Sequence, residues 1–180
     1  MPDRPARPLL PLAALLLAGC GVIPTPVVAL RDTTVPLANT FITQGKVVYV
    51  NQDQLEGVTL PAALRGLTIR GNALYNASGG DLGTVKLYVR STLDGLDATC
   101  STVPFTSPTM YACDPAGESA QAIGTVTVQA GTKVPFTLSG AALDAAARTG
   151  RGYFGFQVVT GTALNGESVN LTSVTAQARL

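Results

Sequence analysis

The stretch TVKLYVR, residues 84–90, decides the fold class, because polar and apolar side chains alternate along it. Val85, Leu87 and Val89 fall on one side of an extended chain, and the residues between them fall on the other. A period of two is typical of an antiparallel strand with one buried face. The stretch therefore predicts a strand whose valine and leucine side chains belong to a core.

The same alternation recurs towards the C-terminus, in GTVTVQ (124–129) and VPFTL (134–138). Pro135 cannot donate a backbone hydrogen bond to a neighbouring strand, so we expect its strand at a sheet edge or at a bulge. In the final run VNLTSVTAQARL (169–180) the apolar residues change from odd to even positions. A β-bulge near Thr172–Ser173 would return all of them to one face.

Turn-forming residues separate these strands. The glycine-containing segment NASGGDLG (76–83) lies between LTIRGNALY (67–75) and TVKLYVR, and it predicts a hairpin. One helix is indicated by SGAALDAAARTG (139–150), with Ser139 as its N-cap and Gly150 as its stop.

The chain of 180 residues has room for one domain and an N-terminal segment. Its 19 glycines, 12 prolines and low content of charged residues (13%) suit a fold with many tight turns. About eight short strands and one short connecting helix predict an all-β fold, an antiparallel β-sandwich of jelly-roll or immunoglobulin-like kind. A closed barrel is the alternative. We expect the domain to span residues 35–180.

The N-terminus has the order of features of an export signal. Arg4 and Arg7 precede an apolar run over residues 9–17, which is too short to span a bilayer and reads as the core of a signal peptide over residues 1–19. The tetrapeptide LAGC, residues 17–20, resembles the lipobox of bacterial lipoproteins. An ordinary signal peptide with a chance cysteine is the alternative.

The resemblance covers residues 1–20 only and implies a lipid anchor. In that family the cysteine receives a diacylglyceryl group and becomes the N-terminus after cleavage, so Cys20 would carry the lipid and residues 20–34 would form a short tether. Two or more acyl chains hold a protein stably on a membrane. We therefore expect a protein exported to the cell envelope and attached to a bacterial membrane.

The two remaining cysteines predict a structural disulfide. Exported thiols meet an oxidising compartment, and with Cys20 assigned to lipid only Cys100 and Cys113 are left to pair. The chain has no histidine for a usual zinc site, and the spacing is not that of a Cys-x-x-Cys redox pair.

Several function classes are disfavoured by what the sequence lacks. The absence of histidine excludes a Ser-His-Asp triad and a Cys-His dyad, and neither a P-loop nor a GxGxxG motif occurs. Ten basic and ten acidic residues follow residue 19, so nucleic-acid binding is not expected. We expect no cofactor.

Two features have both a structural and a functional interpretation. Asp94 and Asp97 lie three apart in a glycine-containing loop, where they can serve either as calcium ligands or as ordinary turn residues. The turn interpretation is favoured, so we predict no metal site. In GYFGFQVV (152–159), Phe154 and Phe156 belong to the core side, whereas Tyr153 faces the other way and can join a binding surface.

These observations favour a non-enzymatic, membrane-anchored lipoprotein whose sandwich contacts an envelope polysaccharide or an envelope protein. The alternative is a histidine-free carboxylate enzyme that acts on cell-wall glycans, which requires two carboxylates across a cleft. A subunit of an envelope assembly that pairs through its edge strands is a third possibility.

The lipid anchor makes the first testable prediction. Cys20→Ala removes the only thiol to which the lipid can be attached in the lipobox-like segment, so the protein should move from the membrane fraction to the soluble fraction of fractionated cells. Immunoblotting of the two fractions measures the change. Retention of the variant in the membrane fraction would contradict the anchor.

Overall fold

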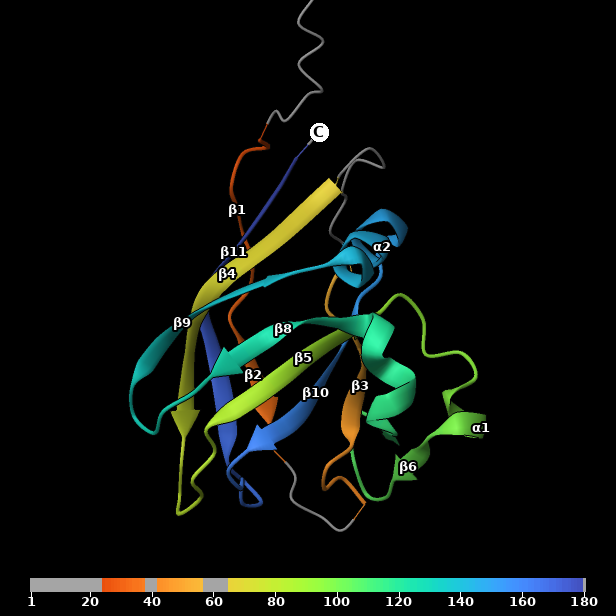
Figure 1. Cartoon of the computed structure of the whole chain (residues 1–180), viewed down its shortest axis with the longest axis vertical. Coiled ribbons are helices and arrows are strands. Elements are labelled where there is room, and N and C mark those ends of the chain that lie inside the picture. Colours follow the sequence, from red (N-terminus) through yellow and green to blue (C-terminus); the bar gives the residue numbers. More distant parts are fainter. Residues whose placement is uncertain (1–23, 38–41, 57–64, 180) are drawn as a thin grey trace, which may run out of the picture.

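The computed structural model describes residues 24–37, 42–56 and 65–179, and these form two antiparallel β-sheets packed as a sandwich (Figure 1). The all-β sandwich predicted from the alternation of side chains is therefore confirmed. Buried apolar residues from both sheets form one main core between them.

The first sheet has the order β1-β11-β4-β9, and β2 pairs with β11 on the same side as β1. Its strands are β1 (Val28–Ala29), β2 (Thr33–Pro36), β4 (Arg65–Asn76), β9 (Lys133–Ser139) and β11 (Ser168–Arg179). The second sheet has the order β6-β7-β3-β10-β5-β8. Its strands are β3 (Val47–Asp53), β5 (Thr84–Arg90), β6 (Ser101–Val103), β7 (Met110–Cys113), β8 (Ala122–Thr127) and β10 (Tyr153–Thr160).

Within the described residues, three short helices connect the strands: α1 (Leu96–Thr99), the 3₁₀-helix η1 (Pro115–Gln121) and α2 (Ala141–Thr149). The sequence predicted α2 alone. Gly150 ends α2 in the left-handed conformation, with φ of 66°, as expected for a glycine stop. The predicted N-cap is wrong, because Ser139 ends β9 and Gly140 occupies the N-cap position without a side-chain hydrogen bond.

The predicted strand pattern is confirmed at its main points. Val85, Leu87 and Val89 are buried in the main core. β9, which contains Pro135, lies at the edge of its sheet. The register of β11 against β4 shifts between Thr172 and Thr175, where Ser173 has a φ of 53°, so the predicted bulge is present.

One residue of the alternation pattern is not on a solvent face. Tyr88, predicted to point outwards from β5, is only 1% exposed. It belongs to a second, smaller apolar cluster on the other side of its sheet, under α1 and the Cys100–Cys113 region. The buried members of this cluster are Val47, Tyr49, Tyr88, Leu96 and Cys113.

The predicted hairpin over residues 67–90 is wrong. β4 and β5 lie in different sheets, so the turn at residues 76–83 carries the chain across the sandwich instead of pairing its two flanking strands. Local turn signals do not specify which sheet the next strand joins, because strand pairing depends on contacts distant in sequence.

The predicted tether over residues 20–34 is also wrong for its described part, because residues from Pro24 onwards already pair with β11. β1 and β2 both pair with β11, and Pro24 bridges to Arg179. The backbone N–H of Thr25 donates to the Ala178 carbonyl at 2.9 Å, and the Thr25 hydroxyl accepts from the Ala178 N–H at 3.0 Å. These bonds fasten the start of the described chain to the end of β11.

At the far end of the β4–β11 pairing, a buried carboxylate joins two loops. Glu167 is 2% exposed, and its Oε1 accepts hydrogen bonds from the backbone N–H groups of residues 78–80 at 2.7–3.1 Å. Its Oε2 accepts from the Leu164 N–H at 2.6 Å and from the Tyr75 hydroxyl. One side chain thus satisfies the backbone of both loops.

These contacts shift two pKa values. Burial alone would raise the pKa of Glu167, but the hydrogen bonds from Tyr75 and from the backbone stabilise the ionised carboxylate and lower its pKa far below the usual range. Burial, and secondly the hydrogen bond to Glu167, raise the pKa of Tyr75 to about 12. Glu167 is therefore ionised at neutral pH.

The low pKa of Glu167 predicts how stability depends on pH. An unfolded glutamate titrates near about pH 4.3, so ionised Glu167 stabilises the fold above that pH, and the contribution is lost as the pH falls towards the lower folded pKa. Glu167→Gln should therefore lower the free energy of unfolding at pH 7, and the difference from the wild type should shrink by about pH 3.

Urea unfolding over this pH range measures the difference. Asp94→Asn, which changes an exposed carboxylate, is the control and should leave the free energy of unfolding at pH 7 close to that of the wild type. If the curves of Glu167→Gln and the wild type stay parallel, the assignment of Glu167 is wrong.

Candidate functional site

A polar cleft of about 480 Å³ lies where the end of β3, the end of α2 and the start of β10 meet. Asn51 and Asp53 come from β3, Glu56 from the turn after it, and Tyr153 is the first residue of β10. Thr149, the last residue of α2, and the two residues after it complete the wall. Two segments distant in sequence, residues 51–56 and residues 149–153, thus supply the cleft.

Backbone hydrogen bonds fix the frame of the cleft. Asp53 Oδ1 accepts from the N–H groups of Leu55 and Gly152, each at 2.9 Å, and the Gln54 N–H donates to the Gly152 carbonyl at 2.9 Å. A Cβ on Gly152 would lie 2.8 Å from the Leu55 side chain, so only glycine permits this close approach. The cleft is therefore held in shape before any ligand arrives.

Four polar side chains in the cleft have no partner among the described residues. They are the amide of Asn51, the carboxylate of Glu56, the guanidinium of Arg151 and the hydroxyl of Tyr153. Asn51, Glu56 and Arg151 are exposed, and Tyr153 is half-buried. The cleft thus offers donors, acceptors and one aromatic ring to a ligand.

This set of groups suits a polar, uncharged ligand with many hydroxyl groups. An amide and a carboxylate accept from hydroxyls, and a guanidinium donates to them, with charge-assisted bonds being the stronger ones. An aromatic ring offers an apolar surface beside its polar hydroxyl. The placement of Tyr153 agrees with its expected position on the side away from Phe154 and Phe156, which pack on the main core.

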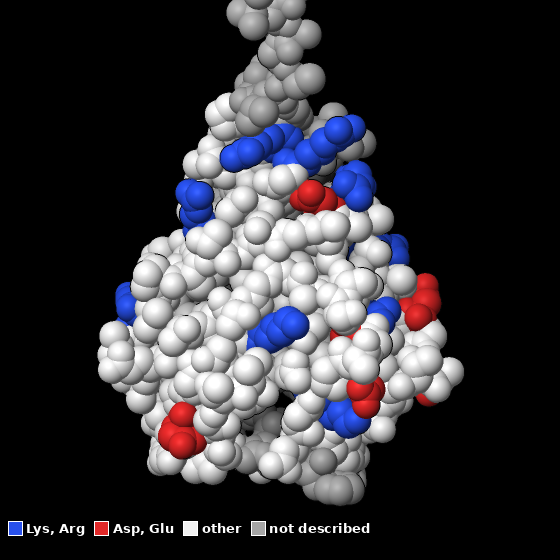
Figure 2. Space-filling model, in the orientation of Figure 1, with Lys and Arg blue, Asp and Glu red and all other residues white. Residues whose placement is uncertain are grey.

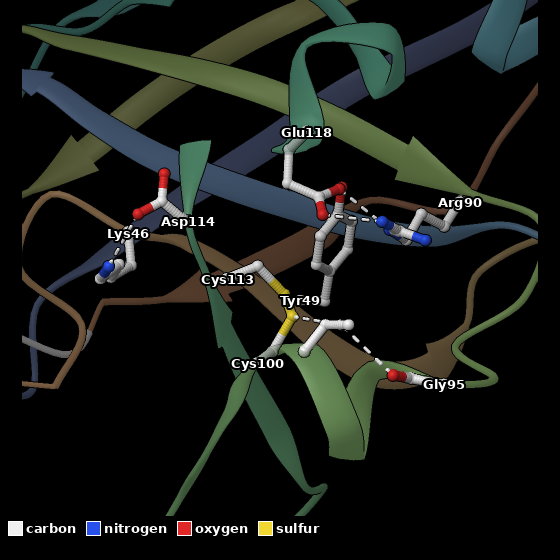
Figure 3. Close-up of a disulfide and its surroundings, with 9 residues drawn as sticks. Lys46, Tyr49, Arg90, Gly95, Cys100, Cys113, Asp114 and Glu118 are labelled. Carbon is white, nitrogen blue, oxygen red and sulfur yellow. Dashed lines mark hydrogen bonds and ion pairs between the residues drawn. A yellow bond between two sulfur atoms is a disulfide. The ribbon is translucent and has the colours of Figure 1, made fainter. Parts of the chain in front are cut away.

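The predicted disulfide is confirmed. Cys100 and Cys113 are joined with a Cα–Cα separation of 4.5 Å, and they close the β6–β7 hairpin at its base (Figure 3). The segment between them is thus an irregular hairpin.

A buried polar cluster lies beside the disulfide (Figure 3). The Tyr49 hydroxyl donates to Glu118 Oε2 at 2.7 Å, and Arg90 donates to both carboxylate oxygens, from Nε at 2.9 Å and from a terminal nitrogen at 2.7 Å. Tyr49 and Glu118 are buried, whereas the Arg90 side chain is 23% exposed. Burial, and then the bond to Glu118, raise the pKa of Tyr49, and the same carboxylate raises the pKa of Arg90.

This cluster has a structural role. Glu118 lies on η1, Tyr49 on β3 and Arg90 on β5, so the three side chains fasten η1 to the outer side of the second sheet. The sulfur atoms of Cys100 and Cys113 and the Glu118 carboxylate lie within 4.8 Å of one another. Because the sulfurs are joined in a disulfide, they cannot act as thiolate ligands to a metal.

The remaining predicted site residues lie apart from the cleft. Asp94 and Asp97 are both exposed, one just before α1 and one within it. Among the described residues, no group of three ligand side chains includes either of them. Cys20, the predicted lipidation residue, lies outside the described residues.

Most residues of the cleft were not predicted from the sequence. Asn51, Asp53 and Glu56 stand in one segment and Arg151 in another, without a shared motif, and Tyr153 alone carried a predicted binding role. The glycine pair in ARTGRGY (147–153) was the one available signal, since two glycines around an arginine suggest a close backbone approach.

The polar cluster beside the disulfide makes a stability prediction. Glu118→Gln leaves the partly buried Arg90 without its ionic partner, so the free energy of unfolding should fall by about 2 kcal/mol or more. The control is Asp114→Asn, which breaks the exposed Lys46–Asp114 ion pair of 3.3 Å but keeps a side-chain oxygen that can cap η1 at the Ala116 N–H, so its loss should be clearly smaller. Urea unfolding measures both, and equal losses would contradict the structural role of Glu118.

Comparisons with known proteins found no matching family model, no matching curated protein and no matching solved structure. No helix among the described residues is long and apolar enough to cross a membrane.

Proposed function

We propose that this protein is an exported, lipid-anchored module of the cell envelope that binds a glycan in the polar cleft without chemically changing it. The observation that carries the glycan assignment is the convergence of unpaired polar groups and one tyrosine in a preformed cleft. Concave sites bind small ligands, and a few placed polar groups fix the orientation of the ligand.

The anchor rests on the lipobox-like residues 17–20. The disulfide supports export, because such bonds persist in oxidising compartments. The near-neutral charge of the chain after residue 19 fits a neutral ligand better than a strongly charged polymer.

The choice of a glycan over a protein ligand follows from the shape and chemistry of the cleft. A concave polar site accepts a chain of sugar hydroxyls, whereas protein interfaces have an apolar, aromatic-rich centre. Arg151 and Glu56 can form charge-assisted hydrogen bonds to hydroxyls, and the Tyr153 ring can lie against the apolar face of a sugar.

A second candidate, the carboxylate enzyme, is favoured by the presence of both Asp53 and Glu56 in the same cleft. Asp53 uses Oδ1 to hold the backbone of Leu55 and Gly152, which suits a structural role better than proton transfer. We therefore rank binding above hydrolysis.

A sedimentation assay tests the proposal. The disulfide-bonded protein is mixed with purified peptidoglycan sacculi and, separately, with insoluble envelope polysaccharide from the same cells, and both pelleted protein and released soluble sugar are measured. We expect saturable pelleting with one of these glycans and no sugar release. Tyr153→Ala should weaken binding about tenfold, the scale of one lost aromatic contact.

The matched control is Phe105→Ala, which removes another exposed aromatic side chain at the tip of the β6–β7 hairpin, outside the cleft. It should bind as the wild type does. Equal loss in both variants, or no pelleting with either glycan, would contradict the glycan site. If the wild type releases soluble sugar and Glu56→Gln does not, the protein is a carboxylate enzyme and not a binding module.

A further inference from the structure

Three exposed arginines gather at the end of the sandwich where the described chain begins. Arg65 opens β4, Arg179 ends β11, and Arg148 lies in the last turn of α2. Figure 2 shows Lys and Arg side chains gathered at this end of the molecule, above a face that is mostly uncharged. We refer to Arg65, Arg148 and Arg179 as the arginine cluster.

The elements themselves bring the cluster together. Arg65 and Arg179 are partners across the β4–β11 ladder. α2 is fastened to the start of β4, because the Asp144 carboxylate accepts from the N–H groups of Gly66 at 3.0 Å and Leu67 at 2.7 Å. Arg148 follows Asp144 by one helical turn and so lies on the same side of α2.

The cluster is not neutralised by ion pairs within the described residues. Neither Arg65, Arg148 nor Arg179 forms a salt bridge there. Like charges directly opposite each other on neighbouring strands destabilise a sheet, so the pairing of Arg65 with Arg179 is unfavourable in the free protein. An anion bound between them would remove this repulsion.

Few acidic side chains lie at the same end, and some of them already accept backbone hydrogen bonds. Asp144 uses both of its oxygens to accept backbone hydrogen bonds. Asp53 and Glu56 belong to the neighbouring cleft, together with a fourth arginine, Arg151. Four arginines and three side-chain carboxylates thus lie at this end, so its side chains carry one net positive charge, although the chain after residue 19 is neutral.

The same end lies next to the expected anchor. Pro24 bridges to Arg179, and only residues 21–23 separate Pro24 from Cys20. Even fully extended, this distance is no more than about 14 Å. If Cys20 carries a lipid, the arginine cluster must lie within reach of the membrane surface.

We propose that the arginine cluster binds the anionic phosphate headgroups of the membrane in which Cys20 is anchored, so that the sandwich rests on the bilayer with its arginine end down. This inference rests on the lipid anchor of the proposed function. Guanidinium groups bind phosphates by paired hydrogen bonds, and each basic residue at an anionic membrane surface adds to the attraction. The contact would fix the orientation of the domain, with the polar cleft on its flank.

A vesicle assay tests the headgroup contact separately from the lipid anchor. Residues 20–180 with Cys20→Ser retain every described strand and carry no lipid. This protein is sedimented with vesicles of phosphatidylglycerol and with vesicles of phosphatidylcholine, at about 20 mM and about 150 mM salt. We expect binding to phosphatidylglycerol only, weakened at the higher salt because the contact is electrostatic.

The decisive comparison is between two triple variants that remove the same charge. Arg65→Gln/Arg148→Gln/Arg179→Gln should reduce binding at least about tenfold, whereas Arg70→Gln/Lys86→Gln/Lys133→Gln, which changes basic residues elsewhere on the sandwich, should bind as the wild type does. Circular dichroism and the intact disulfide show that both variants are folded.

Two results would overturn the inference directly: no binding of the unlipidated protein to phosphatidylglycerol vesicles, or equal losses of binding in the two triple variants. A third is inhibition of vesicle binding by millimolar inorganic phosphate, because the arginine cluster would then bind a soluble anion as well as a lipid headgroup. Each of them leaves the anchor itself untouched, because membrane fractionation of Cys20→Ala decides the anchor. Conversely, recovery of the wild-type protein in the soluble fraction of cells would contradict the lipid anchor, whatever the result of the vesicle assay.

Discussion

The pairing of β11 with its neighbours on both sides is the constraint on which the rest of the structure depends. On one side β11 runs along β4 from Ser168–Asn76 to Arg179–Arg65, and on the other it holds β1 and β2. The bulge at Ser173 keeps the apolar side chains on the core side throughout. Because the N-terminal and C-terminal ends of the described chain meet on this strand, β11 also determines where the described chain begins, at Pro24.

The two ends of the β4–β11 pairing have different chemistry. At the far end, the ionised Glu167 carboxylate satisfies the backbone of two loops and is hidden from solvent. At the near end, the arginine cluster stays exposed and unpaired among the described residues, and the polar cleft lies beside α2. Buried charge is therefore used to hold the fold, and exposed unpaired charge is left at the end proposed to meet the membrane.

The sequence predicted what depends on local periodicity. Alternation located strands such as residues 84–90, the parity change located the bulge at Ser173, and cysteine parity in a chain expected to be exported located the disulfide. Which strands pair with one another could not be predicted from the sequence, because β4 and β5 join different sheets although a turn connects them. Tyr88 was misplaced for a related reason, since an apolar cluster on the second face of a sheet breaks the simple rule of one buried face. Most cleft residues were not predicted because no motif links the two separate segments, residues 51–56 and 149–153.

Intact-mass spectrometry of the protein, extracted with detergent from membranes of the cells that make it, tests the central claim of a membrane-anchored sandwich most directly. The account predicts a chain that begins at Cys20, lacks residues 1–19 and carries the added mass of a diacylglyceryl group on that cysteine. A chain that begins elsewhere, or one in which Cys20 keeps a free thiol, would contradict it. Such a result would also remove the reason to expect a membrane close to the arginine cluster.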